Sequence, residues 1–250
     1  MLSNVQRLKI LQRKWILAAA LGVLIWLCFF FWLQTWWQQP YSLRWLVISG
    51  LALSYLLWVL WNGLADNHRQ GETELLTSFG LGNLLSVGRG YIMVLFFGFL
   101  FSPWPDDGWT AWLPGLLYTL AALPDFVDGI AARLSNHVTN LGETLDMSID
   151  SIGVLGVTLL SVHYGQAPWP YLLVGLARYI FIAGIWLRHK LALPVHELAF
   201  SVRRRGYAAL GMGLFFVILY PIFTPPGTHV VALIFSAYIL GGFLWDWLVT

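Results

Sequence analysis

Four aspartates from Asp125 to Asp150 have the spacing of a metal site. Asp125 and Asp128 are three residues apart, and Asp146 and Asp150 are four apart. Residues at these offsets share one face of a helix, because each residue turns by about 100°. Carboxylate oxygens without a Cys or His cluster favour a hard cation, Mg²⁺ or Mn²⁺. An ionised carboxylate at a membrane boundary is costly unless it meets a cation or water, so we predict a divalent-metal site between two helices.

Small residues and an arginine accompany the aspartates. Gly129 and Ala132 lie on the first predicted helix, and Gly142 lies on the second. They leave room for a bulky group to approach the backbone, and the fork of donors on Arg133 fits phosphate. We therefore expect a clamp for a diphosphate. A solvated helix-turn-helix with incidental ion pairs is the alternative for any one aspartate, but it does not account for four.

The elements that position these residues belong to a membrane protein. Of the 250 residues, 58% are hydrophobic and 10% are charged, whereas a soluble domain carries about 25% charged residues. The single cysteine, Cys28, excludes an internal disulfide framework and a thiolate-rich metal site. The first apolar run, residues 15–37, is longer than a signal-peptide core, so we expect no cleaved signal. No nucleic-acid motif is present, so no nucleic-acid partner is expected.

Eight segments approach the length of about 20 apolar residues that a membrane-spanning helix needs. The fourth segment is short, and we expect its helix to continue into the aspartate motif. The predicted fold is an all-α polytopic membrane protein with an N-terminal extension of two transmembrane helices (1–63), a cytoplasmic connector (64–80) and a six-helix catalytic core (81–250). The eight expected spans are 15–37, 43–62, 82–101, 109–124, 143–163, 169–187, 207–222 and 229–248.

The positions of Lys and Arg predict the orientation in the membrane. Basic residues gather at the N-terminus, from Arg7 to Lys14, and in the 188–205 loop. With eight spans, both segments lie on one side, together with the aspartate loop and the C-terminus. We therefore expect both termini and the site to face the cytoplasm, in a bacterial or archaeal plasma membrane.

The full pattern D-x2-D-G-x2-A-R-x8-G-x3-D-x3-D resembles the signature of the CDP-alcohol phosphotransferases, and every signature residue is present. A weaker second likeness is the run from Gly82 to Arg89. It is similar to the P-N-x-x-T-x-x-R start of the family's first core helix, with Gly for Pro and Ser for Thr. The resemblance covers the chain from about Gly82 onward and implies a six-helix core that forms a homodimer.

The resemblance also implies roles for residues. Asp125, Asp128 and Asp146 would hold the metal ions that bridge the diphosphate of a CDP-linked donor, with Asp150 also near the metal. Asp150 would be the general base that takes the proton from the acceptor hydroxyl; whether it is base, ligand or both stays open. Residues implied to contact the donor nucleotide or its phosphates are Asn83, Ser86, Gly129, Ala132, Arg133 and Gly142.

Two arginines, Arg89 and Arg178, stand within apolar spans. A charge at the centre of a span costs about 2.5–3.5 kcal/mol, so each should face a partner or a cavity. Arg89 is near the cytoplasmic end, so it either snorkels to the interface in a structural role or belongs to the site as a contact for the acceptor or a phosphate. Arg178 is deeper, and we predict that it contacts an acidic acceptor or a phosphate.

Three further arginines form a run in the 188–205 loop. This run either binds a phosphorylated acceptor or anchors the loop to anionic lipid, and we assign two of the three to anchoring. Members of the family that use glycerophosphate often carry a Gly-Lys-x-Lys-Thr-like stretch here, which this chain lacks, so the acceptor stays open. The run is Arg203, Arg204 and Arg205.

These features together predict an enzyme of phospholipid synthesis. It would transfer a phosphatidyl group from CDP-diacylglycerol to the hydroxyl of a small polar alcohol and release CMP. An alternative with the same signature is transfer of a choline or ethanolamine head group from its CDP derivative to diacylglycerol. The alternatives outside enzymes are a cation transporter that uses the aspartates and a lipid-binding scaffold.

Overall fold

The computed structural model describes residues 2–69, 71–105, 108–131, 139–193 and 217–249, without the side chains of residues 124–131. The described residues form helices and no strand, with one isolated β-bridge between Arg69 and Thr139. This confirms the all-α class. The chain divides into two compact units, residues 1–105 with 116–152, and residues 106–115 with 153–250. Each unit is described by itself.

Six described helices are long and apolar enough to cross a membrane, which confirms the polytopic class. Helix α4 (Leu113–Ala131), which follows the 3₁₀ turn η2 (Gly108–Trp112), is not among the six, and it continues through Asp125 and Asp128 as predicted. The count of eight spans stays a prediction, because most of the expected 207–222 segment lies outside the described residues. The six are α1 (Asn4–Leu33), α2 (Gln39–Asn62) with η1 (Gly63–Asp66), α3 (Gly80–Phe97), α5 (Asn140–His163), α6 (Leu172–Lys190) with η3 (Trp169–Tyr171), and α8 (Gly227–Val249).

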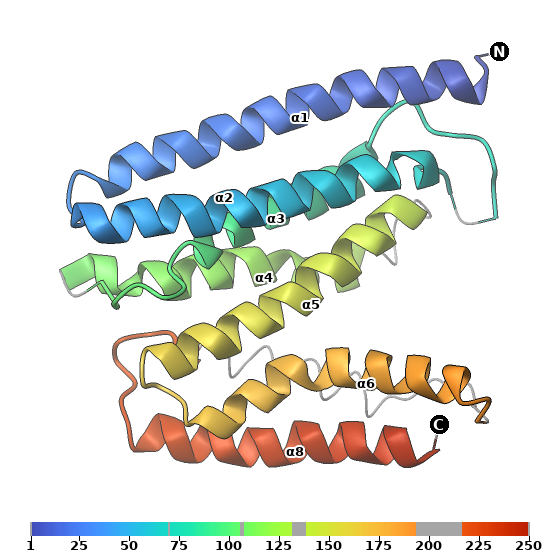
Figure 1. Ribbon diagram of the computed structural model, residues 1–250. Coiled ribbons are helices and arrows are strands. Elements are labelled where there is room, and N and C mark those ends of the chain that lie inside the picture. The colour runs from blue at the N-terminus through green and yellow to red at the C-terminus, as the bar shows by residue number, and fades with distance from the viewer. Residues whose placement is uncertain (1, 70, 106–107, 132–138, 194–216, 250) are drawn as a thin grey trace. The chain divides into compact units, whose positions relative to one another are not determined.

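Helix α1 begins at a capping box. The Ser3 hydroxyl accepts from the Gln6 N–H at 3.3 Å, and the Gln6 side chain accepts from the Ser3 N–H at 3.0 Å. Its 30 residues give a length of about 45 Å, which exceeds the roughly 30 Å hydrocarbon core. We therefore expect its basic first turns to lie outside the hydrocarbon region. Helix α2 returns antiparallel beside it (Figure 1).

Small residues let α1 and α2 pack closely on α3. The Trp45 side chain is fully buried, and its Nε1 donates to the Leu95 carbonyl at 3.0 Å. The Tyr91 hydroxyl of α3 donates to the Ala18 carbonyl of α1 at 2.6 Å, and Gly22 makes room for the ring, since a Cβ there would lie 2.6 Å from it. Small residues at the interfaces between membrane helices typically let the helices approach each other closely. The division at residue 63 into extension and core stays a prediction.

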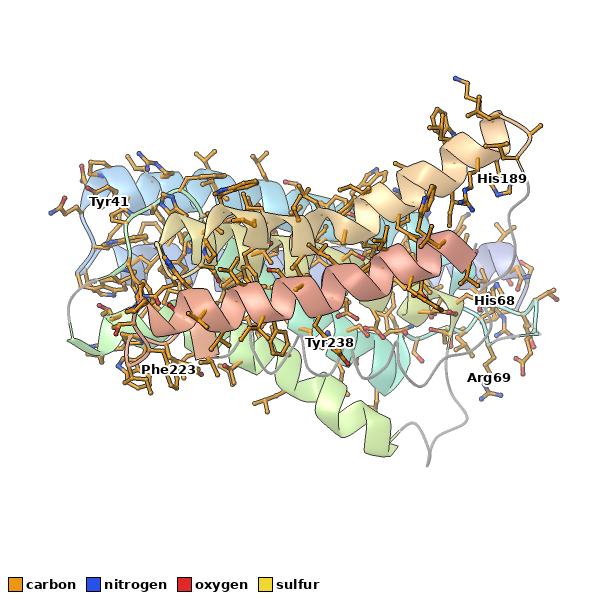
Figure 2. The ribbon with its side chains drawn as sticks, turned by 90° about the horizontal axis from the view of Figure 1, so that it is seen from below. Tyr41, His68, Arg69, His189, Phe223 and Tyr238 are labelled. Atoms are coloured by element: carbon orange, nitrogen blue, oxygen red, sulfur yellow. The ribbon has the colours of Figure 1, made fainter. Side chains whose placement is uncertain are left out.

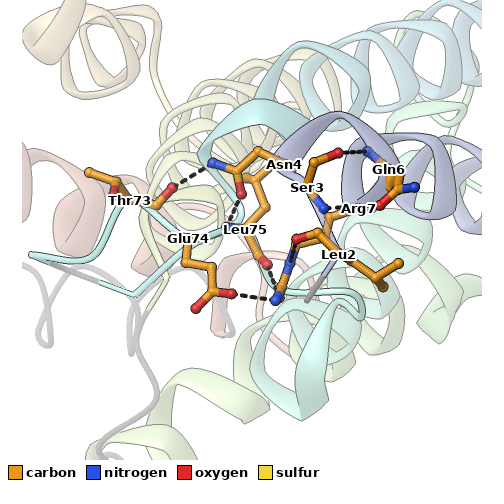
Figure 3. Close-up of polar contacts among 8 residues, drawn as sticks. All are labelled: Leu2, Ser3, Asn4, Gln6, Arg7, Thr73, Glu74 and Leu75. Atoms are coloured by element: carbon orange, nitrogen blue, oxygen red, sulfur yellow. Dashed lines mark hydrogen bonds and ion pairs between the residues drawn. The ribbon is translucent and has the colours of Figure 1, made fainter.

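The connector (64–80) folds back against the start of α1. The Asn4 amide donates to the Thr73 carbonyl at 3.1 Å and accepts from the Leu75 N–H at 3.2 Å, and Arg7 pairs with Glu74 (Figure 3). Tyr41 lies in the first turn of α2. Figure 2 shows His68 and Arg69 of the connector at the opposite end of unit 1 from Tyr41. The connector thus lies at the same end of unit 1 as the start of α1.

In the second unit, α6 and α8 lie side by side and run in parallel (Figure 1). A Cβ at Gly184 would lie 2.5 Å from the Trp247 ring, so the glycine permits close contact. The Arg188 guanidinium lies 4.1 Å from the centre of that ring and donates to the Trp247 carbonyl at 3.2 Å. These contacts fix the C-terminal half of α6, the helix that carries Arg178.

Candidate active site

Helix α5 presents Asp146 and Asp150 one turn apart. The helix starts after Thr139, whose hydroxyl accepts from the Gly142 N–H at 3.1 Å in the geometry of an N-cap. The spacing of four places both carboxylates on one face. Their side chains are 44% and 37% exposed, so a ligand can reach them.

Arg89 of α3 holds both carboxylates. Its Nη2 lies 2.7 Å from Asp150 Oδ1, its Nη1 lies 3.4 Å from Asp146 Oδ1, and its Nε donates to the Ala121 carbonyl of α4 at 2.9 Å. Only 4% of the Arg89 side chain is exposed, so it packs inside unit 1, and its contact with an acceptor or a phosphate stays a prediction. A buried guanidinium needs partners that satisfy its charge and its donors, and these three provide them. Arg89 therefore joins α3, α4 and α5.

The described part of this cluster has an acidic excess. Among the described side chains, two carboxylates meet one guanidinium here, so acidic groups outnumber basic groups by one on this face of α5. Ala121, Asp125 and Asp128 stand at offsets 0, 4 and 7 and share one face of the α4 backbone. The hydrogen bond from Arg89 to the Ala121 carbonyl therefore joins α3 to the face of α4 that carries Asp125 and Asp128.

The predicted metal site includes residues whose side chains the structure does not describe. Among the side chains that the structure describes, no group of three or more Asp, Glu, His or Cys could hold a metal ion. The side chains of Asp125 and Asp128 are not among them, so the four-carboxylate prediction is untested. The oxygen donors of Asp146 and Asp150 are of the kind that Mg²⁺ prefers.

A buried polar network lies where α3 meets the start of α5. Asn83 is 3% exposed; its Oδ1 accepts from the Thr139 hydroxyl at 2.8 Å, and its Nδ2 donates to Asn67 Oδ1 at 2.9 Å. A Cβ at Gly142 would lie 2.5 Å from Asn83 Oδ1, so the glycine gives the amide its space. Ser86, one turn along α3, is buried and donates to the Gly82 carbonyl at 3.2 Å.

The other predicted site residues are placed elsewhere or not described. Arg178 is half-buried on α6, in the second unit, and the described part of the chain gives it no hydrogen bond or ion pair. Its role stays a prediction. Residues whose side chains or whole placement lie outside the described part are Asp125, Asp128, Gly129, Ala132, Arg133, Arg203, Arg204 and Arg205.

Sequence reasoning missed Asn67 and Thr139. A signal existed for Thr139, because a threonine just before a predicted helix is a favoured N-cap. Asn67 carries no comparable signal, since it is one of several polar residues in a polar segment. Only its contact with Asn83, 16 residues away, marks it.

Comparisons with known proteins add to this geometry. Residues 79–245 match the model of a family described as CDP-alcohol phosphatidyltransferase.

A Mycobacterium tuberculosis protein provisionally named cardiolipin synthase is 31% identical over 117 residues, which are 45% of this chain and 54% of that protein. The CDP-diacylglycerol–glycerol-3-phosphate 3-phosphatidyltransferase of Cereibacter sphaeroides is 32% identical over 105 residues, 41% of this chain and 44% of the relative. The Bacillus subtilis protein of the same name is 29% identical over 118 residues, 44% and 61% of the two chains. The chain thus spans about half the length of the curated relatives it matches, and no solved structure shows a significant match to it.

Proposed function

Because the chain belongs to the CDP-alcohol phosphatidyltransferase family, we propose that it transfers a phosphatidyl group from CDP-diacylglycerol to an alcohol and releases CMP. One observation of the structure supports this most directly. Asp146 and Asp150 stand one turn apart, accessible, and held by the buried Arg89. Such an arrangement holds the carboxylates in one orientation for contact with a charged substrate. A solvated helix face with incidental ion pairs would not require a buried arginine.

Asp150 is the proposed general base. The acceptor hydroxyl attacks the donor phosphorus that bears the diacylglycerol group. A new P–O bond forms, the P–O bond to CMP breaks, and CMP leaves with the electron pair while the hydroxyl proton moves to Asp150. Arg89 engages Oδ1 of Asp150, which leaves Oδ2 to take the proton.

Asp125, Asp128 and Asp146 are the proposed ligands of a divalent ion, Mg²⁺ or Mn²⁺. The ion would neutralise charge on the diphosphate. The residues fit this group because the described carboxylates offer hard oxygen donors and because acidic groups outnumber basic groups among the described side chains of the cluster with Arg89. Asp150 is proposed to lie near enough to share the ion.

The donor nucleotide is proposed to lie against the polar end of α3. Asn83 is buried there, and its amide keeps one hydrogen and one lone pair beyond its bonds with Asn67 and Thr139. Gly129, Ala132 and Arg133 are the proposed contacts of the nucleotide and its phosphates from α4 and the residues after it. The basic N-terminus of α1 lies at this end of unit 1 (Figure 1), which supports a cytoplasmic site by the positive-inside rule.

An anionic acceptor is the most specific proposal that the chain supports. Two relatives are named for transfer to glycerol 3-phosphate, and another is named for cardiolipin. Arg178, half-buried within a membrane span, is the proposed contact for an acceptor phosphate, together with a residue of the 203–205 run. Glycerol 3-phosphate is therefore the first acceptor to test, with phosphatidylglycerol second, because its phosphatidylation gives cardiolipin.

The experiment is an assay of CMP release by the full chain in lipid nanodiscs with CDP-diacylglycerol, Mg²⁺ and one acceptor at a time. We expect acceptor-dependent CMP release that is lost in Asp150→Asn and on removal of Mg²⁺ with EDTA. The matched control is Asp66→Asn, an exposed carboxylate in η1 that should retain wild-type rates. Release that is unaffected by Asp150→Asn would refute the role of Asp150. No CMP release with any acceptor, combined with no binding of CDP-diacylglycerol, would refute the proposed function.

A further inference from the structure

The connector contributes a fully buried side chain to the site region. Asn67 is 0% exposed, and its Nδ2 donates to the Ser78 carbonyl at 3.0 Å and to the Leu76 carbonyl at 3.5 Å. Its own carbonyl accepts from the Leu76 N–H at 2.8 Å. Since two carbonyl oxygens face the amide nitrogen, the side-chain oxygen of Asn67 must point the other way.

That oxygen meets Asn83. The Asn67 Oδ1 accepts from Asn83 Nδ2 at 2.9 Å, while the Thr139 hydroxyl donates to Asn83 Oδ1 at 2.8 Å. The Asn83 amide is therefore held at both of its atoms, and its orientation is determined by its partners. Without Asn67, the buried Nδ2 would lose its described acceptor, and the amide would be free to turn.

The connector also holds the start of α5. The Asn140 N–H donates to the His68 carbonyl at 3.3 Å, and Arg69 forms a β-bridge with Thr139. Asp146 stands two turns further along the same helix. One short segment thus sets both the Asn83 amide and the beginning of the helix that carries the two described carboxylates.

We propose that Asn67 is a positioning residue for the donor nucleotide, acting through the Asn83 amide. This inference rests on the proposed function, in which Asn83 contacts the donor. It adds a residue that lies ahead of the region matched by the family model, residues 79–245. Asn67 does not touch the donor; it presents the remaining hydrogen and lone pair of Asn83 in one fixed direction.

The test is a double-mutant cycle of Asn67→Ala and Asn83→Ala, measured by the KM for CDP-diacylglycerol, by kcat, and by the Kd for CMP in calorimetry. Loss of one hydrogen bond of ordinary net strength changes an equilibrium by about fivefold. We expect Asn67→Ala to raise KM and the CMP Kd by about that factor or more, with a smaller change in kcat. We expect the double variant to be no worse than Asn83→Ala alone, because residues that act through one another are not additive.

Two further variants separate positioning from loss of stability. Asn67→Asp keeps an acceptor for Asn83 but sets a carboxylate oxygen against the carbonyls of residues 76 and 78, so it should lower thermal stability while it keeps donor affinity nearer to wild type than Asn67→Ala does. Ser49→Ala removes another buried polar group of unit 1, the acceptor of Trp26 Nε1 at 2.8 Å, which lies within α2 and has no described contact with this network. It should lower thermal stability without changing KM.

The outcomes distinguish this inference from the proposed function. A wild-type protein that releases CMP, combined with additive effects of the two substitutions on KM, would overturn the positioning role alone. An equal rise in KM for Ser49→Ala would also overturn it, because the effect would then be general destabilisation. A wild-type protein with neither CMP release nor nucleotide binding would overturn both proposals.

Discussion

At the scale of single residues, Arg89 shows why side-chain type matters as much as charge. Its guanidinium reaches two carboxylates and one carbonyl from one planar group, and each of these three described contacts is 3.4 Å or shorter. A lysine ammonium is a point charge on a flexible stem and lacks this fork. The function of Arg89 in the proposed site is therefore to keep Asp146 and Asp150 in a fixed orientation.

The first prediction concerns Arg89→Lys. We expect CMP release to fall by about 10- to 100-fold, as is usual when a residue that orients catalytic or metal-binding groups is lost. The variant should still fold, because the charge is retained. The matched control is Arg44→Lys, an exposed arginine that donates to the Phe101 carbonyl and lies outside the site. Steady-state kinetics of both proteins in nanodiscs would decide, and an Arg89→Lys rate equal to that of the control would contradict the orienting role.

At the scale of elements, α3 and α5 meet through polar groups that extend from the start of each helix to its middle. Asn83, Ser86 and Arg89 stand at offsets 0, 3 and 6 along α3, all are buried, and Asn83 and Arg89 contact α5 or its cap. Gly142 completes the contact, since its missing side chain leaves the space for the Asn83 amide. Packing against Asn83 therefore explains why a glycine stands at position 142, in addition to any contact of Gly142 with the donor.

The second prediction concerns Gly142→Ala. The added methyl group would displace the Asn83 amide, so we expect a loss of stability of about 1–3 kcal/mol, as in other overpacked sites, together with a higher KM for the donor. Gly88→Ala is the control, because a Cβ at this position of α3 meets nothing within 4 Å. It should be neutral or slightly stabilising, by up to about 1 kcal/mol. Thermal unfolding and donor titrations measure both effects, and equal behaviour of the two variants would show that the close approach is unimportant.

At the scale of the whole molecule, the described half of the proposed site lies in one compact unit with α1 and α2. The connector is bound on one side by Asn4 and Arg7 of α1 and on the other by Asn83 of α3. The sequence predicts that the two N-terminal helices form an extension (1–63) of the six-helix core, without assigning them a role. The structure adds that the connector behind them has contacts of its own with the site region.

The third prediction compares two truncations. A chain that lacks residues 1–62 keeps Asn67 and the α3–α5 network, so its turnover per folded molecule should stay close to that of the full chain. It should unfold at a lower temperature, because the Trp45 and Tyr91 contacts with their neighbours are lost. A chain that lacks residues 1–79 also loses Asn67 and should show a raised KM for the donor. Equal KM values for the two truncations would argue that the connector has no part in donor binding.

The sequence by itself was enough for the membrane class, the helical architecture, the continuation of α4 through Asp125 and Asp128, and the family. The first three follow from composition, from apolar run length and from residue spacing along one helix, and the family follows from the resemblance of the whole motif from Asp125 to Asp150; all of these are local properties of the chain. The partners of Arg89 and the link from Asn67 to Asn83 were decided only by the tertiary structure. They join residues 16 to 61 positions apart, and no local period specifies which polar groups meet when helices pack. A buried donor takes the acceptor that packing brings to it, so its partner becomes known only with the fold.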